Sequence, residues 1–316
     1  MHKILVDTSE ERCICDFRLL GFRDVLILGR YDYHEARLPL QIHDHGELME
    51  ICYLAEGKQF YRVAGKDYFL RGGDVLINYP HESHGTGFFC EGKGCLYWLI
   101  LHPPDWQSEF LGMFSGNGKI LYENFLRFPS RHFKLKAGTH KNLEMIFTLF
   151  ENKNKDKSEK DSVCSDQTFE QMNSFFQMNV RNYLLRFFLD LAESGQSQHQ
   201  TDISADIIRV VDRIKADEEL FYTMKQLARV AGLSESRFKH RFREEVGTTP
   251  ADYQIRHKID RACQMLLRDR KTILDTALSL GFSSSQYFAT VFRRYMGMSP
   301  AEYRNIMNSP EYREQK

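Results

Sequence analysis

Four side chains in the N-terminal part of the chain have the types and spacing of a ligand-binding or metal-binding site. His43 and His45 are two residues apart, so one face of an extended strand presents both imidazoles. Glu50 has the opposite parity and requires a turn or bulge near Gly46 to reach the same side. With a further imidazole, for which His84 is a candidate, these side chains can hold a divalent metal such as zinc, nickel, manganese or iron. The alternatives are that they hydrogen-bond a bound effector or only one another.

A second set of residues suited to recognition lies in two C-terminal segments that repeat one pattern. The upstream parts align at an offset of 49 (Gly232 with Gly281), and the downstream parts at 50 (Gly247 with Gly297), so the second copy has one extra residue. A unit used twice indicates a repeated structural element. Each copy has the order helix, glycine-containing turn, helix, which is the spacing of a helix-turn-helix.

The second helix of each unit has an aromatic face and a polar face. Phe238 and Phe242 are four residues apart and share one side, as do Phe288 and Phe292. Such a helix can lie in a DNA major groove, with its first residues at base edges and later ones at phosphates. The alternative, an amphipathic helix with a solvated face, is disfavoured by the duplication. The positions opposite the aromatic stripe are Ser236, Lys239, His240 and Arg243, and fifty residues on Gln286, Ala289, Thr290 and Arg293.

A single long helix is predicted between the two units. Thr249-Pro250 and Ser299-Pro300 each place a hydroxyl at an N-cap and Pro at the first helical position. From Pro250 to about Arg268 nothing interrupts the apolar stripe, and at about 1.5 Å per residue this helix is roughly 28 Å long. That length is near the roughly 34 Å of one DNA turn, so the helix can hold two recognition helices in successive major grooves.

Residues from about 203 to 306 resemble the DNA-binding domain of the AraC/XylS family of bacterial transcription regulators. The resemblance is carried by Gly281-Phe282 through Tyr287-Phe288, by Phe292-Arg293 and Gly297, and by Pro300 to Tyr303-Arg304. It implies duplex DNA, a small-molecule effector, RNA polymerase and a second copy of the chain as partners. The base contacts that it implies are Ser236, Lys239 and His240 in the first recognition helix, and Ser285, Gln286, Ala289 and Thr290 in the second. Arg243 and Arg293 are the expected phosphate contacts.

The N-terminal part is predicted to be built of short strands. Turn signals separate strands expected at 25–30, 48–55, 59–63, 68–70, 75–78 and 95–101, which indicates a sandwich or barrel. His43, His45 and Glu50, followed by Gly57, resemble the first cupin motif, and Gly73, Pro80 and His84 resemble the second. That second motif lacks its glycine and is one residue short. In regulators of this kind, a cupin barrel commonly binds a small molecule, often a sugar, without chemistry. The expected effector pocket comprises His43, His45, Glu50, His84, Tyr53, Tyr61 and Trp98.

Two helices are predicted between these parts, at Lys141–Asn152 and Phe169–Ser194. The resemblance implies a dimer contact for them, and the alternative is packing against the same chain's barrel. The mixed-charge stretch 153–161 is expected to be a solvated loop, and the polar stretch 194–200 a linker. The expected domains are 1–137, 138–200 and 201–316, with helix-turn-helix units at about 223–246 and 272–296.

Composition limits the remaining options. The formal net charge is zero, but residues 201–316 carry 20 basic and 16 acidic side chains, against 23 and 27 in the remainder. We therefore expect much of the affinity for DNA to come from the placement of a few cations and backbone amides rather than from bulk charge. Seven cysteines, an odd number, fit a reducing cytoplasm, and we expect no signal peptide or membrane span.

The sequence thus predicts an α+β multidomain protein: a cupin-like β-barrel (jelly-roll) with following helices, then an all-α domain of two helix-turn-helix units joined by a long helix. The predicted function is ligand-responsive, sequence-specific regulation of transcription by a non-enzymatic protein, with a divalent metal in the barrel as the candidate cofactor. The competing hypothesis is a metal-dependent cupin enzyme fused to a DNA-binding domain, with His43, His45, Glu50 and His84 as ligands.

Overall fold

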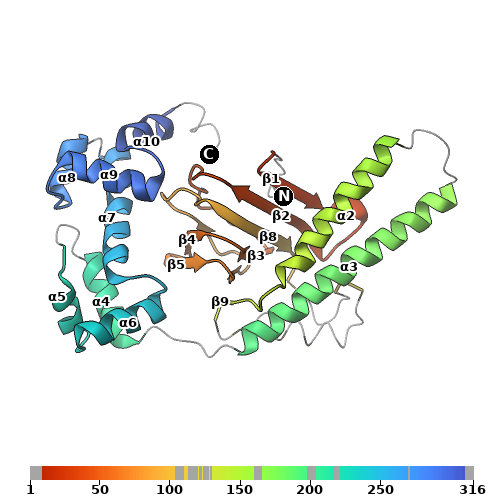
Figure 1. Ribbon diagram of the computed structural model, residues 1–316, viewed down its shortest axis with the longest axis horizontal. Helices are drawn as coiled ribbons and strands as arrows, with labels where there is room; N and C mark the ends of the chain where they lie inside the picture. Colours follow the sequence, from red (N-terminus) through yellow and green to blue (C-terminus); the bar gives the residue numbers. More distant parts are fainter. Residues whose placement is uncertain are drawn as a thin grey trace.

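The computed structural model describes residues 9–103, 110–112, 120, 123, 128, 130–159, 166–197, 204–216, 221–269 and 271–309. For those of them that fall within 154–173, and for residue 197, it describes the backbone alone. Figure 1 shows a β domain in the N-terminal part, two long helices against one side of it, and a C-terminal helical domain on the other side. None of the described helices is both long and apolar enough to cross a bilayer.

The described strands of the β domain form two antiparallel sheets. The larger has the order β1-β2-β8-β3-β6-β9 and the smaller β5-β4-β7. The six predicted strands are confirmed, whereas β1, β7 and β9 were not anticipated. The bounds are β1 Arg12–Asp16, β2 Val25–Tyr33, β3 Met49–Leu54, β4 Lys58–Val63, β5 Lys66–Arg71, β6 Asp74–Asn78, β7 His84–Gly85, β8 Gly94–Leu101 and β9 His132–Lys134, with a 3-10 helix at Phe17–Leu20.

The larger sheet has a different core on each face. Because side chains alternate along a strand, consecutive residues of β3 point to opposite faces. Cys52 lies in the interior between the two sheets, packed with Tyr61 and Trp98. Tyr53 lies on the outer face, in the core formed with the two long helices.

The two long helices are α2, His140–Glu159, and α3, Asp166–Ser197, which lie side by side along the larger sheet (Figure 1). The predicted loop at 153–161 is wrong for 153–159, which continue α2, while 160–161 lie outside the described residues. The predicted linker is likewise helical up to Ser197. Lys, Glu and Gln form helices readily enough to extend one that packing has already nucleated, and neither segment contains proline.

The C-terminal domain contains the two predicted helix-turn-helix units. Phe238, Phe242, Phe288 and Phe292 are fully buried in one core, and both recognition helices end at a glycine in the left-handed region, Gly247 and Gly297. The helices are α4 Ala205–Ala216, α5 Met224–Val230, α6 Glu235–Val246, α7 Pro250–Leu267, α8 Ile273–Ser279, α9 Ser285–Met296 and α10 Pro300–Met307.

Helix α7 is the predicted connecting helix, and its two ends contact different units. The recognition helices α6 and α9 lie near its opposite ends (Figure 1). Thr249 caps α7 by accepting from the backbone N–H of Asp252, and Ser299 forms a reciprocal capping box with Glu302 at α10. Both copies therefore keep a hydroxyl N-cap at this position, and the second copy adds the reciprocal contact from Glu302.

The smaller sheet packs on the helical domain. Phe60 of β4 and Phe69 of β5 belong to the same core as α7, and the Phe69 ring contacts Tyr253 edge-on with a centroid distance of 6.0 Å. The β4–β5 hairpin is thus placed between the interior of the β domain and the DNA-binding helices.

Candidate functional site

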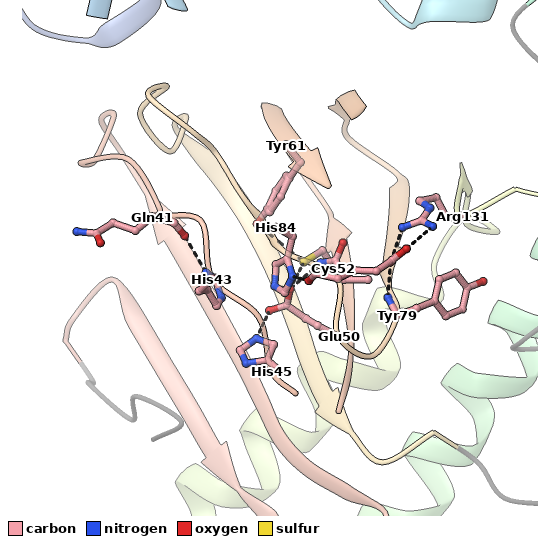
Figure 2. A network of polar contacts seen from close by, with 11 residues as sticks. Gln41, His43, His45, Glu50, Cys52, Tyr61, Tyr79, His84 and Arg131 are labelled. Carbon is pink, nitrogen blue, oxygen red and sulfur yellow. Dashed lines mark hydrogen bonds and ion pairs between the residues drawn. The ribbon is translucent and has the colours of Figure 1, made fainter. Parts of the chain in front are cut away.

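The chain brings the three predicted histidines and the glutamate together between the sheets (Figure 2). His43 and His84 form an isolated β-bridge, with backbone hydrogen bonds of 3.0 and 2.8 Å in the two directions. Gly46 adopts a φ of 61° in a turn, and Glu50 follows on β3. The turn required by the parity of Glu50 is therefore present at the predicted residue, where a left-handed conformation favours glycine.

Two of the imidazoles are held by backbone carbonyls. His43 Nδ1 lies 2.8 Å from the Gln41 carbonyl oxygen, and His84 Nδ1 lies 2.9 Å from that of Glu82. A carbonyl oxygen only accepts, so each Nδ1 must carry the hydrogen, and in the neutral ring Nε2 then carries a lone pair. This arrangement prepares both Nε2 atoms to bind a cation.

Glu50 is buried and faces this cluster. Its Oε2 accepts from Asn78 Nδ2 at 2.8 Å and lies 3.0 Å from His84 Nε2, while Oε1 lies 3.7 Å from His45 Nε2. Burial raises the pKa of Glu50, but the adjacent His84 and His45 more than offset this and hold it well below its usual value. Burial likewise lowers the pKa of His84, and the Glu50 carboxylate reverses the effect, so its pKa is raised.

The cluster is suited to hold one positive charge. With Nδ1 of His84 protonated, a neutral ring would direct a lone pair at the carboxylate of Glu50, so a proton or a metal ion is needed between them. One ligand atom from each of His43, His45 and His84 lies within 4.8 Å of the others. Tetrahedral ligands at bonds of about 2.1 Å are roughly 3.4 Å apart, so small side-chain rotations would bring the three nitrogens to a metal.

Buried nitrogens support the same interpretation. His45 Nε2 and His84 Nε2 are buried without a well-formed hydrogen bond among the described residues. Such orphaned groups are costly unless a bound species satisfies them. These three histidines, backed by Glu50, therefore fit a divalent metal.

The predicted aromatic residues of the pocket are divided between the two faces. Tyr61 and Trp98 lie in the interior, and Tyr61 Oη is 3.8 Å from Cys52 Sγ, which in turn is 3.4 Å from Glu50 Oε2. Tyr53 is on the outer face instead, stacked on His140 of α2. The structure therefore does not bring Tyr53 together with the rest of the predicted pocket, because it has the opposite parity to Glu50 and Cys52 on β3.

Three interior residues were missed by sequence reasoning. Arg12 lies over the Trp98 ring at 4.7 Å, and its Nε, like Tyr31 Oη, is buried without a hydrogen-bond partner among the described residues. Glu91 is buried, and desolvation raises its pKa to about 7, partly opposed by Arg12 and reinforced by Glu50. The unpaired buried polar atoms suit a ligand that offers hydroxyl groups.

The polar faces of both recognition helices are accessible. Ser236, Lys239 and His240 on α6 are exposed, as are Gln286 and Thr290 on α9, whereas Ser285 and Ala289 are half-buried. Arg243 and Arg293 are also exposed, and Arg293 lies 3.3 Å from Glu302. All the predicted DNA contacts are thus at least partly exposed to solvent.

Strand β4 contacts the interior cluster and the helical domain with opposite faces. Its register with β7 pairs Val63 with His84 and Arg62 with Gly85. The Arg62 guanidinium reaches α7, where both terminal nitrogens lie 3.4 Å from the buried carboxylate of Asp260. Strand β4 therefore pairs with the strand that carries His84 and also contacts α7 through Arg62.

Known families match both parts of the chain. Residues 26–146 match the model of the AraC-like ligand binding domain, and residues 227–306 match a helix-turn-helix domain model. The chain belongs to the AraC family. As a family member, it is a DNA-binding transcription regulator with a ligand-binding domain.

Individual AraC-family relatives are distant. The probable transcriptional regulator LumQ of Photobacterium leiognathi is 25% identical over 56% of this chain, which spans 64% of LumQ, just under two thirds of its length. The transcriptional activator RhaS of an Enterobacter species is 24% identical over 85% of this chain and 90% of RhaS. The arabinose operon regulatory protein of Escherichia coli is 23% identical over 78% of this chain and 77% of its own length.

The buried Glu91 predicts a pH dependence of stability for this AraC-family chain. Because its pKa of about 7 exceeds that of an unfolded glutamate, the folded state keeps the proton longer, and stability falls as pH rises from about 4.5 to 7. Over that range the wild type should lose about 3 kcal/mol of its free energy of unfolding, and the Glu91→Gln variant should not show this loss. Denaturant unfolding of the metal-free protein at several pH values measures it. The exposed Glu35→Gln serves as control, and parallel pH profiles for Glu91→Gln and the wild type would refute the assignment.

Proposed function

We propose that this chain is an effector-responsive, sequence-specific regulator in which a small polar molecule held between the sheets changes the placement of the DNA-binding domain. The carrying observation is strand β4, which pairs with the His84 strand and reaches Asp260 of α7 through Arg62. A ligand shifts such an arrangement by its difference in affinity for the two placements, typically about 1–3 kcal/mol.

A hydroxyl-rich effector such as a sugar fits the interior chemistry. Trp98 and Tyr61 provide ring surfaces, and Arg12, Tyr31 and the histidines provide buried polar atoms. One relative is named for the arabinose operon, which supports a carbohydrate. All three relatives named above are regulators, and we accordingly propose a binding function, with no turnover.

We further propose that a divalent metal is part of the effector site. His43, His45 and His84 would hold it, with Glu50 beside them. The metal would supply a Lewis-acidic position to which an effector oxygen can bind. The protein's own contribution is to fix the His43 and His84 rings through backbone carbonyls and to keep Glu50 ionised.

For DNA, we propose that the exposed faces of α6 and α9 contact the bases. The polar groups proposed for base contact on α9 are an amide and hydroxyls, so α6 provides the stronger charge-assisted contact through Lys239, and His240 adds an imidazole N–H. Gln286 can pair with adenine, and Arg243 and Arg293 contact phosphates. Ser236, Ser285, Ala289 and Thr290 complete the proposed base contacts.

We also propose a homodimer formed through α3. Phe175 and Met178 are 66% and 63% exposed, and Leu189 is 42% exposed. At about 100° per residue these three fall within an arc of roughly 60°, so they form one apolar stripe on the side away from the sheet. A second copy of the same helix would cover it, as in a two-stranded coiled coil.

Base recognition can be tested on selected and unrelated DNA. Fragments selected from a random DNA library define the preferred site, and binding is then measured on this site and on unrelated duplex. We expect His240→Ala and Gln286→Ala each to weaken binding to the selected site by about 1–3 kcal/mol, and to weaken binding to unrelated duplex much less. Arg243→Ala and Arg293→Ala should weaken both and reduce the salt dependence. Equal losses on both duplexes for Gln286→Ala would contradict a base contact.

Metal binding by the histidine cluster gives another prediction. We expect metal-free protein to bind one Zn²⁺ per chain in calorimetric titration, and His45→Ala and His84→Ala each to lose at least about tenfold in affinity. The control is His34→Ala, an exposed histidine of the same domain. Since His84→Ala can perturb the buried cluster, the His45 variant decides, and undiminished Zn²⁺ binding by it would exclude the site.

The proposed assembly through α3 predicts a change of oligomeric state. Phe175→Glu combined with Met178→Glu should convert a dimer into a monomer in sedimentation equilibrium, because a dimer would bury these charges against apolar surface. Ile208→Glu on α4, another exposed apolar position, is the control and should leave the dimer intact. A wild-type monomer, or a dimer unaffected by the double change, would contradict the proposed contact.

A further inference from the structure

A cleft of about 330 Å³ lies where the β4–β5 hairpin meets the helical domain. Lys58 and Arg71 line it from the hairpin, and Arg243 and Arg256 line it from α6 and α7. The cleft is thus formed by both domains and is separate from the His43–His45–His84 cluster.

The charges that line this cleft do not balance. Its only described carboxylate, Asp252, is paired with Arg256 at 2.8 Å and also accepts from Thr248 and Tyr295. Arg71 donates to the Gly247 carbonyl, which is a neutral group. The remaining cations, Lys58 and Arg243, form no ion pair among the described residues.

Three uncompensated positive charges in a partly enclosed space indicate an anion as the occupant. Like charges held together in a cleft disfavour the docked arrangement, and a bound anion would reverse the effect. Guanidinium groups suit the oxygens of a phosphate, and lysine adds a point charge. A singly charged carboxylate would leave much of the surplus unneutralised.

We propose that this cleft binds a phosphate group, held by Lys58 and Arg71 of the β domain and Arg243 of the DNA-binding domain. The phosphate comes either from a free phosphorylated molecule or from the backbone of bound DNA, since both present the same oxygens. In either case the bound phosphate bridges the two domains and stabilises their docked arrangement. This adds the β domain to the anion contacts, beyond the proposed recognition helices.

The first arm of the experiment uses the full-length, metal-free protein and inorganic pyrophosphate. Thermal unfolding is compared in pyrophosphate and in sodium chloride at equal ionic strength. For a free phosphate ligand, Tm rises by roughly 3–5 °C at saturation, and Lys58→Gln and Arg71→Gln lose most of that rise. Lys66→Gln, a lysine at the other end of the same hairpin, is the matched control and keeps it.

The second arm measures binding to a random-sequence duplex over a range of salt concentrations. If the phosphate belongs to DNA, pyrophosphate gives no specific stabilisation, and Lys58→Gln lowers affinity and reduces the salt slope by about one. Lys66→Gln leaves both unchanged. The Lys58 side chain makes no hydrogen bond among the described residues, so its variant stays interpretable if Arg71→Gln disturbs docking through Gly247.

The proposal is overturned if Lys58→Gln and Lys66→Gln show the same rise in Tm with pyrophosphate and also the same affinity and salt slope for duplex DNA. This result is distinguishable from failure of the proposed regulatory function, because wild-type binding to selected and random DNA is measured independently. Base recognition by Gln286 would stand in that case, and only the interdomain phosphate contact would be lost.

Discussion

A carboxylate buried in one domain depends on a guanidinium from the other. Asp260 of α7 is only slightly exposed, and burial raises its pKa, although Arg62 of β4 opposes that shift. One of its oxygens, Oδ1, has no hydrogen-bond partner among the described residues. An uncompensated buried charge costs several kcal/mol, so the docked arrangement requires Arg62 to stay in place. The apolar contacts of Phe60 and Phe69 with α7 favour docking, and the ion pair fixes where the hairpin sits along the helix.

Because docking depends on Arg62, the alternating direction of side chains along the six-residue strand β4 matters for function. On β4, Tyr61 points to the interior network of Cys52 and Glu50, while Arg62 beside it points to Asp260. Because successive side chains of a strand face opposite ways, one strand can contact two sites without an additional element. A movement of His84 could reach Arg62 directly through the backbone pairing of β7 with β4, without rearrangement of the hydrophobic core.

The parts of the molecule set by local rules could be predicted from sequence, and those set by tertiary context could not. The duplicated helix-turn-helix, the Thr249 and Ser299 caps and the turn at Gly46 each depend on a few neighbouring residues. Tyr53 was misplaced although its parity, opposite to Glu50 on β3, already directs it to the other face; only the packing of the long helices on that face depended on tertiary context. The mixed-charge segment 153–159 extends α2, because nothing in it ends a helix that packing has already started. The histidine cluster was predicted from the resemblance of its residues to the cupin motifs, whereas the two backbone carbonyls that direct the Nε2 lone pairs of His43 and His84 come from the fold.

The two sites with unbalanced charge lie at opposite ends of strand β4 and differ in the sign of the charge that they lack. The interior cluster beside the end of β4 requires a positive charge between His84 and Glu50, whereas the cleft at its beginning, around Lys58, has surplus positive charge. If occupancy of either site favours the docked hairpin, thermodynamic linkage makes each occupant strengthen binding of the other. A chain with no formal net charge can still attract an anion at this cleft, because Lys58, Arg71 and Arg243 gather positive charge locally where the two domains meet.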